Sequence, residues 1–192
     1  MRPKLTDYKI KNEELMKKWQ DEDDINSYNE LVRRFKDRLV NFIHGFLYDI
    51  DRAHDLSQDT LLKLFTHKHS YEPRAALSTW LFTIAGNLAR TELRKIKRRK
   101  TKSFSQLSGD EYEFNLDRME ILEDDDSSED MNVIRDGISK LNEDFRVIII
   151  MRDFQELSYD IISKILKVPV GTVKSRINRA RLKLHDIVNE ES

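Results

Sequence analysis

Apolar residues recur every three or four positions along the chain after Ile25. The first repeating set is Leu31, Phe35, Leu39, Phe42, Ile43 and Phe46. A second set follows a short polar break at residues 49–51 and comprises Leu56, Leu61, Leu64 and Phe65. This spacing places apolar side chains on one face of a helix, so the pattern predicts two amphipathic helices in succession.

The most regular stripe of the chain comes next, after a loop at residues 67–74 that contains Pro73. Its apolar members are Leu77, Trp80, Leu81, Ile84, Ala85 and Leu88. Polar residues occupy the neighbouring stripe, namely Thr79, Thr83, Asn87, Arg90 and Arg94. Both stripes follow the helical period of about 3.6 residues, so we expect one long helix with a polar face beside its apolar one.

The composition reverses in the middle of the chain. The end of the long helix is basic, with eight Lys or Arg and one acidic residue between Arg90 and Lys102. Between Asp110 and Asp130, by contrast, eleven residues are acidic and only Arg118 is basic. A segment with this charge buries too little apolar surface to order itself, so residues 103–130 are predicted to form a flexible acidic linker.

Helical periodicity returns between Met131 and Val188. Asn142 and Ser158 have side chains that cap helix N-termini, and each precedes a run of apolar residues at helical spacing. Residues 167–171 interrupt the pattern, and Thr172 opens a last helix. Two short helices joined by a tight turn, the second rich in Arg and Lys, are typical of a helix-turn-helix.

These patterns predict an all-α fold made of two small helical domains joined by the flexible acidic linker. Only five Gly and three Pro are present among 192 residues, which is too few turn residues for an all-β fold. We divide the chain into an N-terminal extension (1–24), a first helical domain (25–102), the linker (103–130) and a C-terminal helix-turn-helix domain (131–192).

Composition narrows the classes of function. The absence of Cys excludes disulfides and Cys-ligated zinc and fits a reducing cytoplasm. The longest aliphatic run, Val147–Met151, is far too short to cross a bilayer, so we expect no membrane insertion. His67 and His69 lack companion ligands at metal-site spacing, and no phosphate-binding Gly loop or nucleophile elbow occurs. We therefore expect neither an enzyme nor a bound metal or cofactor.

The polar face of the last helix is a candidate surface for reading DNA. The net charge of −1 argues against nucleic-acid binding, but the charges are segregated along the chain, so each segment counts separately. Asn and Ser can hydrogen-bond base edges, and Arg can read guanine. The candidate residues are Thr172, Lys174, Ser175, Arg176, Asn178, Arg179 and Arg181. A basic helix can also be no more than a solvated face, but the capped helix and turn before it favour DNA.

The polar stripe of the long helix is a candidate surface for unpaired bases. Tyr71 lies in the loop before that helix, and an aromatic ring beside a basic helix suits unpaired bases, which can stack on it. We interpret the basic end of the helix as a surface that follows phosphates, with the Tyr71 loop and the polar stripe around Asn87 as its neighbours. The alternative is a solvated helix end, where cations are favoured by the helix dipole.

Both domains resemble the extracytoplasmic-function (ECF) sigma factors of bacterial RNA polymerase, members of the sigma-70 family. In the first domain the resemblance rests on Ala53–Asp59 with Leu61–Phe65, and on Ser78–Ala89 with Leu93–Lys95. In the second it rests on Leu157–Asp160 and on Val168–Arg176, continuing through Arg179–Arg181 to Leu184. The two matching stretches occur in the order that the family has and cover residues 26–99 and 133–187.

The resemblance implies a non-catalytic subunit that binds core RNA polymerase and recognises promoter DNA for transcription initiation. It assigns contact with the core enzyme to Asp55, Gln58, Asp59 and Leu62. It assigns the minus-ten element to Tyr71, Thr79, Trp80, Thr83, Asn87, Arg90 and Arg94. The minus-thirty-five element falls to the seven candidate residues of the last helix. The family commonly has an anti-sigma factor, which is a further expected partner.

The chain departs from the family pattern at a few positions. Glu156 stands where Gly is usual in the turn before the helix-turn-helix, and Ile161 and Ser163 stand where an acidic residue and Ala are common. Thr91 and Glu92 stand near the family's usual Asp after the minus-ten Asn. The changes at Glu156, Ile161 and Ser163 bear on local turn geometry rather than on function.

Two other functions remain open from the residues alone. A free-standing helix-turn-helix regulator would bind DNA without polymerase and usually as a dimer. A protein-interaction module that blocks polymerase would bind the core enzyme without DNA. Only a sigma factor makes core polymerase start at a defined promoter, so run-off transcription separates the three.

Overall fold

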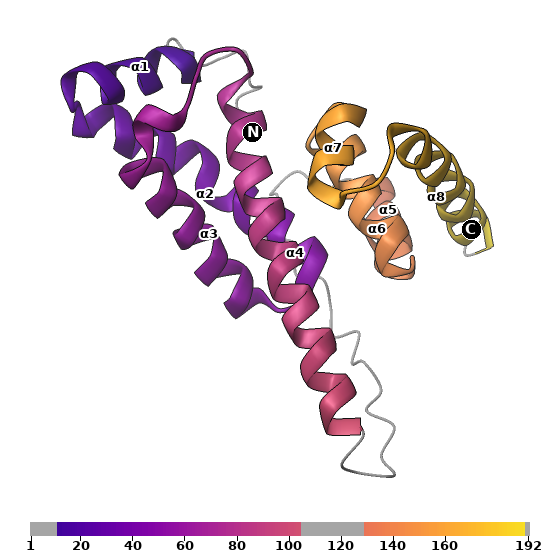
Figure 1. Cartoon of the computed structure of the whole chain (residues 1–192). Coiled ribbons are helices and arrows are strands. Elements are labelled where there is room, and N and C mark those ends of the chain that lie inside the picture. Colours follow the sequence, from indigo (N-terminus) through magenta and orange to yellow (C-terminus); the bar gives the residue numbers. More distant parts are fainter. Residues whose placement is uncertain (1–10, 105–128, 191–192) are drawn as a thin grey trace.

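The computed structural model describes residues 11–104 and 129–190, with side chains for 11–99 and 133–190. Helices account for every regular element in these ranges, and they form two groups that lie side by side (Figure 1). The predicted all-α class and two-region organisation are therefore confirmed. Most of the predicted acidic linker, and residues 1–10 of the N-terminal extension, lie outside the described residues.

The described part of the N-terminal region, residues 11–104, contains four α-helices and one short 3₁₀ turn. They are α1 (Asn12–Glu22), α2 (Ile25–Leu47), α3 (Ile50–Thr66), η1 (Lys68–Ser70) and α4 (Leu77–Phe104). Helix α2 is central and packs against α1, α3 and α4. The side chains of Asp24 and Asp49 accept backbone N–H bonds at the starts of α2 and α3, as N-caps do.

Aromatic packing fixes the angle between α2 and α4. The ring of Phe42 lies 5.2 Å from Phe46 and 5.0 Å from Phe82, in edge-to-face contacts. Phe35, Phe42 and Phe82 are fully buried. Edge-to-face ring pairs are favourable beyond the area that they bury, so this cluster holds α4 against α2 in one orientation.

Helix α1 belongs to this core, although the hydrophobic pattern before Ile25 predicted no helix. Leu15, Met16 and Trp19 are buried, and Trp19 joins Tyr28 and Phe65 in a cluster with ring centroids 5.0–5.3 Å apart. Three apolar positions in one short helix are too few to give a clear periodic signal, so only the tertiary contacts reveal this element.

The C-terminal region is a second helical group. It comprises α5 (Glu129–Ser139), α6 (Glu143–Ile149), a π-helical turn η2 (Ile150–Phe154), α7 (Tyr159–Leu166) and α8 (Val170–Glu190). Asn142 and Ser158 cap α6 and α7 as predicted, accepting the N–H groups of Phe145 and Ile161. Helices α7 and α8 form the predicted helix-turn-helix, with α8 beginning two residues earlier than expected.

Glu156, which stands where the family has Gly, adopts a left-handed backbone conformation with φ 55°. This conformation costs an L-residue roughly 1–2 kcal/mol, and Gly adopts it without that penalty. The turn therefore has the geometry for which Gly is suited, and the chain reaches it with Glu. The neighbouring Leu157 N–H donates to Met151 O at 3.0 Å, which closes the turn.

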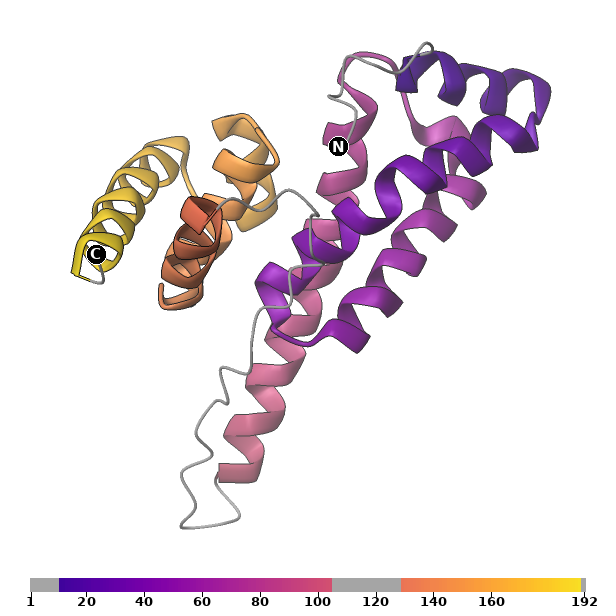
Figure 2. The same cartoon turned by 180° about the vertical axis from the view of Figure 1, so that it is seen from behind.

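The two regions pack against each other through α2 with α6 and α4 with α7 (Figure 2). Glycines allow the close approach, because a Cβ at Gly86 would lie 2.7 Å from Ile165 Cγ2 and one at Gly45 would clash with Ile150. Arg146, only 6% exposed, donates to the carbonyls of Gly45 and Leu141. Its guanidinium also lies 3.7 Å from the centre of the Tyr48 ring. No local sequence pattern predicted this contact.

Candidate DNA and polymerase interfaces

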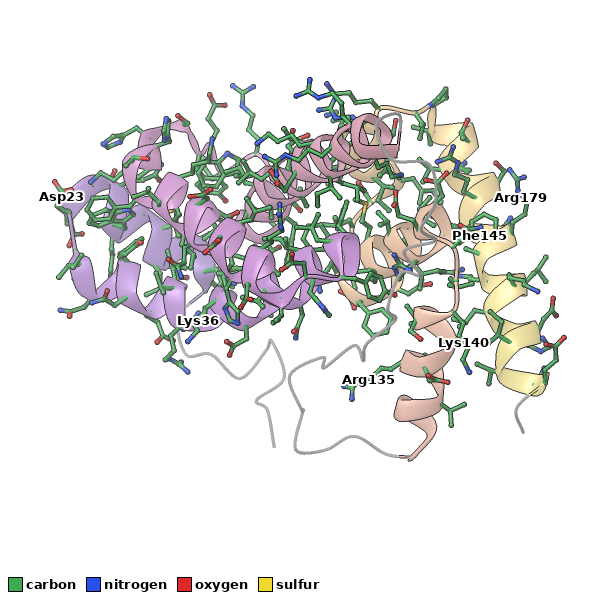
Figure 3. The ribbon with its side chains drawn as sticks, turned by 90° about the horizontal axis from the view of Figure 1, so that it is seen from below. Asp23, Lys36, Arg135, Lys140, Phe145 and Arg179 are labelled. Carbon is green, nitrogen blue, oxygen red and sulfur yellow. The ribbon has the colours of Figure 1, made fainter. Side chains whose placement is uncertain are left out.

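Helix α8 presents an open polar face on the outer side of the C-terminal region. Val173, Ile177 and Ala180 are fully buried against the rest of that region. The opposite face carries the exposed residues Lys174, Ser175, Asn178 and Arg179. Figure 3 shows Arg179 on the side of α8 that is turned away from the N-terminal region. Four of the seven predicted DNA-reading residues therefore form one accessible surface.

The other three predicted residues of α8 have different surroundings. Thr172 is half-buried. Arg176 lies 3.5 Å from the Asp144 carboxylate. Arg181 pairs with Asp153 of η2 through two N–O contacts, one of 3.2 Å, and this raises the pKa of the Arg181 guanidinium. Arg181 thus ties α8 to the π-helical turn, a contact that the sequence analysis missed because the two residues are 28 positions apart.

The polar stripe of α4 lies along one side of that helix, as its spacing predicted. Asn87 and Arg94 are exposed, and the remaining α4 members are half-buried, namely Thr79, Trp80, Thr83 and Arg90. Thr83 Oγ1 donates to the Thr79 carbonyl at 2.7 Å, so this hydroxyl is already engaged with the helix backbone. The amide of Asn87, in contrast, belongs to an exposed residue of the stripe.

Tyr71 is not placed as the sequence analysis expected. Its side chain is only 4% exposed, and its hydroxyl donates to the Ala75 carbonyl at 2.8 Å. The ring packs 5.7 Å from Trp80, centroid to centroid. Burial raises the pKa of the Tyr71 hydroxyl, and the Glu13 carboxylate adds to the effect. The ring has no free face for a base, so Tyr71 shapes the loop from within and half-buried Trp80 is the aromatic ring nearer the surface.

Helix α3 exposes the residues predicted to contact polymerase. Asp55, Gln58 and Asp59 are all exposed, and Leu62 follows them with 57% of its surface exposed. Spacings of three and four residues place these side chains on one face. An exposed Leu next to two carboxylates gives this face both an apolar and an acidic contact element.

Glu92, near the family's usual Asp, links two helices. Its carboxylate accepts from Arg52 Nη1 of α3 at 2.5 Å and lies 3.1 Å from Lys95 Nζ. The Glu92 side chain is 15% exposed, so this pair is better shielded than an ordinary surface ion pair. The departure from Asp therefore leaves a carboxylate in a structural contact between α3 and α4. Arg52 was missed because forty residues separate the partners.

The sequence predicted neither a metal site nor a membrane-spanning segment. Among residues 11–104 and 129–190, no group of three or more His, Cys, Asp or Glu is arranged to hold a metal ion. Within the same ranges, no helix combines the length and apolar character that a membrane span requires.

Both regions of the chain match known proteins. The profile of sigma-70 region 2 matches residues 31–99, and that of sigma-70 region 4 matches residues 131–184. The RNA polymerase sigma-H factor of Pseudomonas aeruginosa is 31% identical over 166 residues, covering 82% of this chain and 84% of that protein. The ECF RNA polymerase sigma factor SigW of Bacillus subtilis is 30% identical over 163 residues, covering 82% and 87%.

Solved structures show the same fold. The sigma factor RpoE from Bartonella quintana, in complex with the anti-sigma factor NepR, superposes with a TM-score of 0.64 and 26% identity. The alignment covers 85% of this chain and 98% of RpoE. The chain belongs to the ECF group of the sigma-70 family: it is a transcription initiation factor that binds core RNA polymerase and directs it to promoters. The free-standing regulator is not favoured.

Proposed function

We propose that this sigma factor reads the minus-thirty-five element with α8, engages the minus-ten element with α4, and docks on core polymerase through α3. The observation that carries the proposal is the exposure of three separate polar faces, one on each of these helices. The first two lie in different regions, as two promoter elements require.

The role of α8 rests on its open surface. An α-helix fits the major groove, where each base pair presents a distinct set of donors and acceptors. Lys174, Ser175, Asn178 and Arg179 are exposed on one side of α8 and have the side chains for this task. Arg176 and Arg181 start from ion pairs with Asp144 and Asp153, so we assign them to positioning or to phosphates rather than to bases.

The role of α4 rests on a mixed polar and aromatic surface beside a basic helix end. Trp80 offers a partly exposed ring, Asn87 an amide, and Arg94 a cation. Unpaired bases are held by stacking and by edge hydrogen bonds, which together offset the cost of leaving the stack. These residues therefore fit capture of melted minus-ten DNA, with Tyr71 supporting the loop instead of stacking on the base.

The role of α3 rests on Asp55, Gln58, Asp59 and Leu62. A carboxylate pair that faces a basic partner gives orientation and association rate more than bulk affinity, and Leu62 adds apolar contact. Reversing both charges, Asp55→Lys with Asp59→Lys, should abolish capture of core polymerase while the helical circular-dichroism signal stays. Reversal of Asp51 and Glu72, both exposed in the same region, serves as the matched control. Normal capture by the Asp55/Asp59 variant would rule out this face.

The direct experiment for the function is run-off transcription with purified core enzyme. The chain should give one transcript with a defined start on its cognate promoter, and core alone should give none. A protein that binds promoter DNA but yields no transcript would contradict the proposal.

We further infer the chemistry, the location and the regulation of this sigma factor. The chain itself makes and breaks no bond, because the polymerase performs the chemistry. It acts in the cytoplasm, where polymerase and promoters are. An anti-sigma factor holds it inactive, and support comes from the related RpoE, whose structure contains the anti-sigma factor NepR. Co-purification of a second protein that blocks capture of core enzyme would test this last statement.

A further inference from the structure

Helix α1 contacts the loop that precedes α4, although it lies outside the stretch that matches sigma-70 region 2, residues 31–99. It packs against η1 and against the start of α4, and Figure 1 shows it beside that end of α4. The loop from residue 67 to residue 76 therefore has α1 on one side and the first turn of α4 at its end.

Gln20 holds the first half of this loop. Its side-chain amide donates to the Lys68 carbonyl at 2.7 Å and to the Tyr71 carbonyl at 3.0 Å. One amide group has two N–H donors, and here both engage backbone oxygens three residues apart. Gln20 thus fixes the path of the chain between Lys68 and Tyr71 without using any side chain of the loop.

Glu13 holds the other end. Its carboxylate accepts the backbone N–H of Leu77, the first residue of α4, at 3.0 Å. The first N–H groups of a helix have no partner within the helix, and a negative charge at this end is favoured by the helix dipole. Glu13 therefore caps α4 from a different helix and sets where its first turn begins.

Lys68 adds a third connection. Its ammonium group donates to the Trp19 carbonyl at 2.9 Å, pairs with Asp23 and lies 4.3 Å from the centre of the Trp19 ring. The burial of Leu15, Met16 and Trp19 anchors α1 in the core. Between these fixed points, residues 72–76 are exposed, so a short open loop is held at both ends by α1.

We propose that Gln20 and Glu13 are positioning residues for minus-ten recognition: α1 is a brace that holds the 67–76 loop and the first turn of α4 ready to receive an unpaired base. The inference rests on the assignment of α4 to the minus-ten element. A site that is ordered before binding avoids the entropy cost of ordering the loop on the DNA, and small displacements of a binding group weaken recognition strongly.

The test measures discrimination at the minus-ten element. Transcription is compared on the cognate promoter and on promoters with each minus-ten base replaced, using Gln20→Ala, Glu13→Ala and the wild type. The ratio of the two rates should fall about fivefold or more at the position that the loop reads, the low end of what one mismatched base costs. Because each ratio compares two promoters with one protein sample, a reduced folded fraction does not change it.

Matched variants sharpen the result. Glu14→Ala and Asp21→Ala remove exposed charges from the same helix and should leave the ratio unchanged. Glu13→Gln keeps an acceptor for the Leu77 N–H and should restore part of the discrimination that Glu13→Ala loses. Hydrogen exchange at the Leu77 amide should accelerate in Glu13→Ala, and capture of core polymerase and affinity for the minus-thirty-five element should stay at the wild-type level.

The variant Asn87→Ala distinguishes the proposed role of α1 from the assignment of α4 to the minus-ten element, on which that role rests. If Asn87→Ala loses minus-ten discrimination while Gln20→Ala and Glu13→Ala keep it, the brace is overturned and the assignment of α4 stands. If the α1 variants lose discrimination and Asn87→Ala does not, the brace is supported and Asn87 is not the base contact. Unchanged ratios in all three variants would overturn both.

Discussion

The two helices that we propose contact DNA, α8 and α4, are built in different ways. The polar face of α8 points into solvent from a small region with an aliphatic core, and α8 packs against α5, α6 and α7 of its own region. Helix α4 instead has an aromatic core behind it, a brace at its N-terminus and a neighbour, α7, at Gly86. The difference suits the two proposed tasks, since reading a duplex needs a projecting face, whereas holding an unpaired base needs a fixed site.

The position of the C-terminal region adds to the contrast. Gly86 and Lys97 of α4 contact Ile165 and Glu143 of the C-terminal region, and both lie on the side of α4 that carries Thr79 and Arg90, because their spacing is helical. The C-terminal region therefore borders the polar stripe of α4, while the exposed polar face of α8 stays open. We expect the regions to separate before both promoter elements are engaged.

The largest expected effect comes from Arg146→Ala, which removes the buried guanidinium between the regions. The variant leaves the Gly45 and Leu141 carbonyls without their charged donor, so the free energy of unfolding should fall by about 2–4 kcal/mol. The regions should also move apart, which small-angle X-ray scattering would detect as a larger radius of gyration. Arg33→Ala, which removes an exposed i,i+3 pair with Glu30, should cost at most about 0.5 kcal/mol. An unchanged radius would show that Arg146 does not hold the packing.

The next effect distinguishes two arginines of α8. Arg179→Ala should weaken binding of the minus-thirty-five element by about 1–3 kcal/mol and relax one promoter position, as loss of a base contact does. Arg181→Ala should instead lower thermal stability, because its partner Asp153 lies within the protein. Fluorescence anisotropy with cognate and substituted duplexes measures the first, and a melting curve the second. Equal loss on every sequence in Arg179→Ala would mean a phosphate contact.

A smaller gain is expected from Glu156→Gly. Because φ at this position is 55°, Gly should relieve the left-handed strain and raise the free energy of unfolding by about 0.5–1 kcal/mol. Asp160→Gly, at an exposed helical position in the first turn of α7, should lower it by about 0.5–1 kcal/mol, because Gly is a weaker helix former and a favourable charge at the helix N-terminus is lost. Urea unfolding of both variants gives the comparison, and a loss of stability in Glu156→Gly would show that the Glu side chain stabilises this turn.

The smallest effect depends on pH and acts at the contact between the regions. Burial lowers the pKa of His44; Asp49 raises it and Arg146 lowers it further. The unfolded chain, with an ordinary His pKa of about 6.5, then takes up a proton that the folded chain resists. Stability should therefore decrease as the pH falls below about 6.5. His44→Gln should reduce this slope in urea unfolding between pH 5 and 8. The wild-type slope in His44→Gln would assign the effect to other groups.

The sequence predicted those features that depend on local patterns. Stripes of apolar residues predicted α2, α3 and α4, and the side chains of Asn142 and Ser158 predicted the starts of α6 and α7. The exposed face of α8 followed from helical spacing, and that of α3 from the family resemblance. The same residues also carried the family resemblance, so the sequence alone predicted the class of protein.

The features that the sequence did not predict all depend on distant contacts. Helix α1 has too few apolar positions to give a clear periodic signal. Its residues Glu13 and Gln20 form hydrogen bonds with backbone groups some fifty to sixty positions away in the sequence. Tyr71 looked like a stacking ring because loops are usually exposed, whereas its hydroxyl and ring are buried. The ion pair of Arg181 with Asp153 is likewise a contact between residues that are 28 positions apart in the sequence.

The most direct test of the contrast between α4 and α8 compares Asn87→Ala and Arg179→Ala in run-off transcription on two templates. One template is fully duplex, and the other carries a mismatched, pre-melted minus-ten segment. Pre-melting removes the cost of extruding a base, so it should restore much of the activity of Asn87→Ala and leave the defect of Arg179→Ala unchanged. Equal rescue of both variants, or rescue of neither, would contradict the assignment of base capture to α4 and duplex reading to α8.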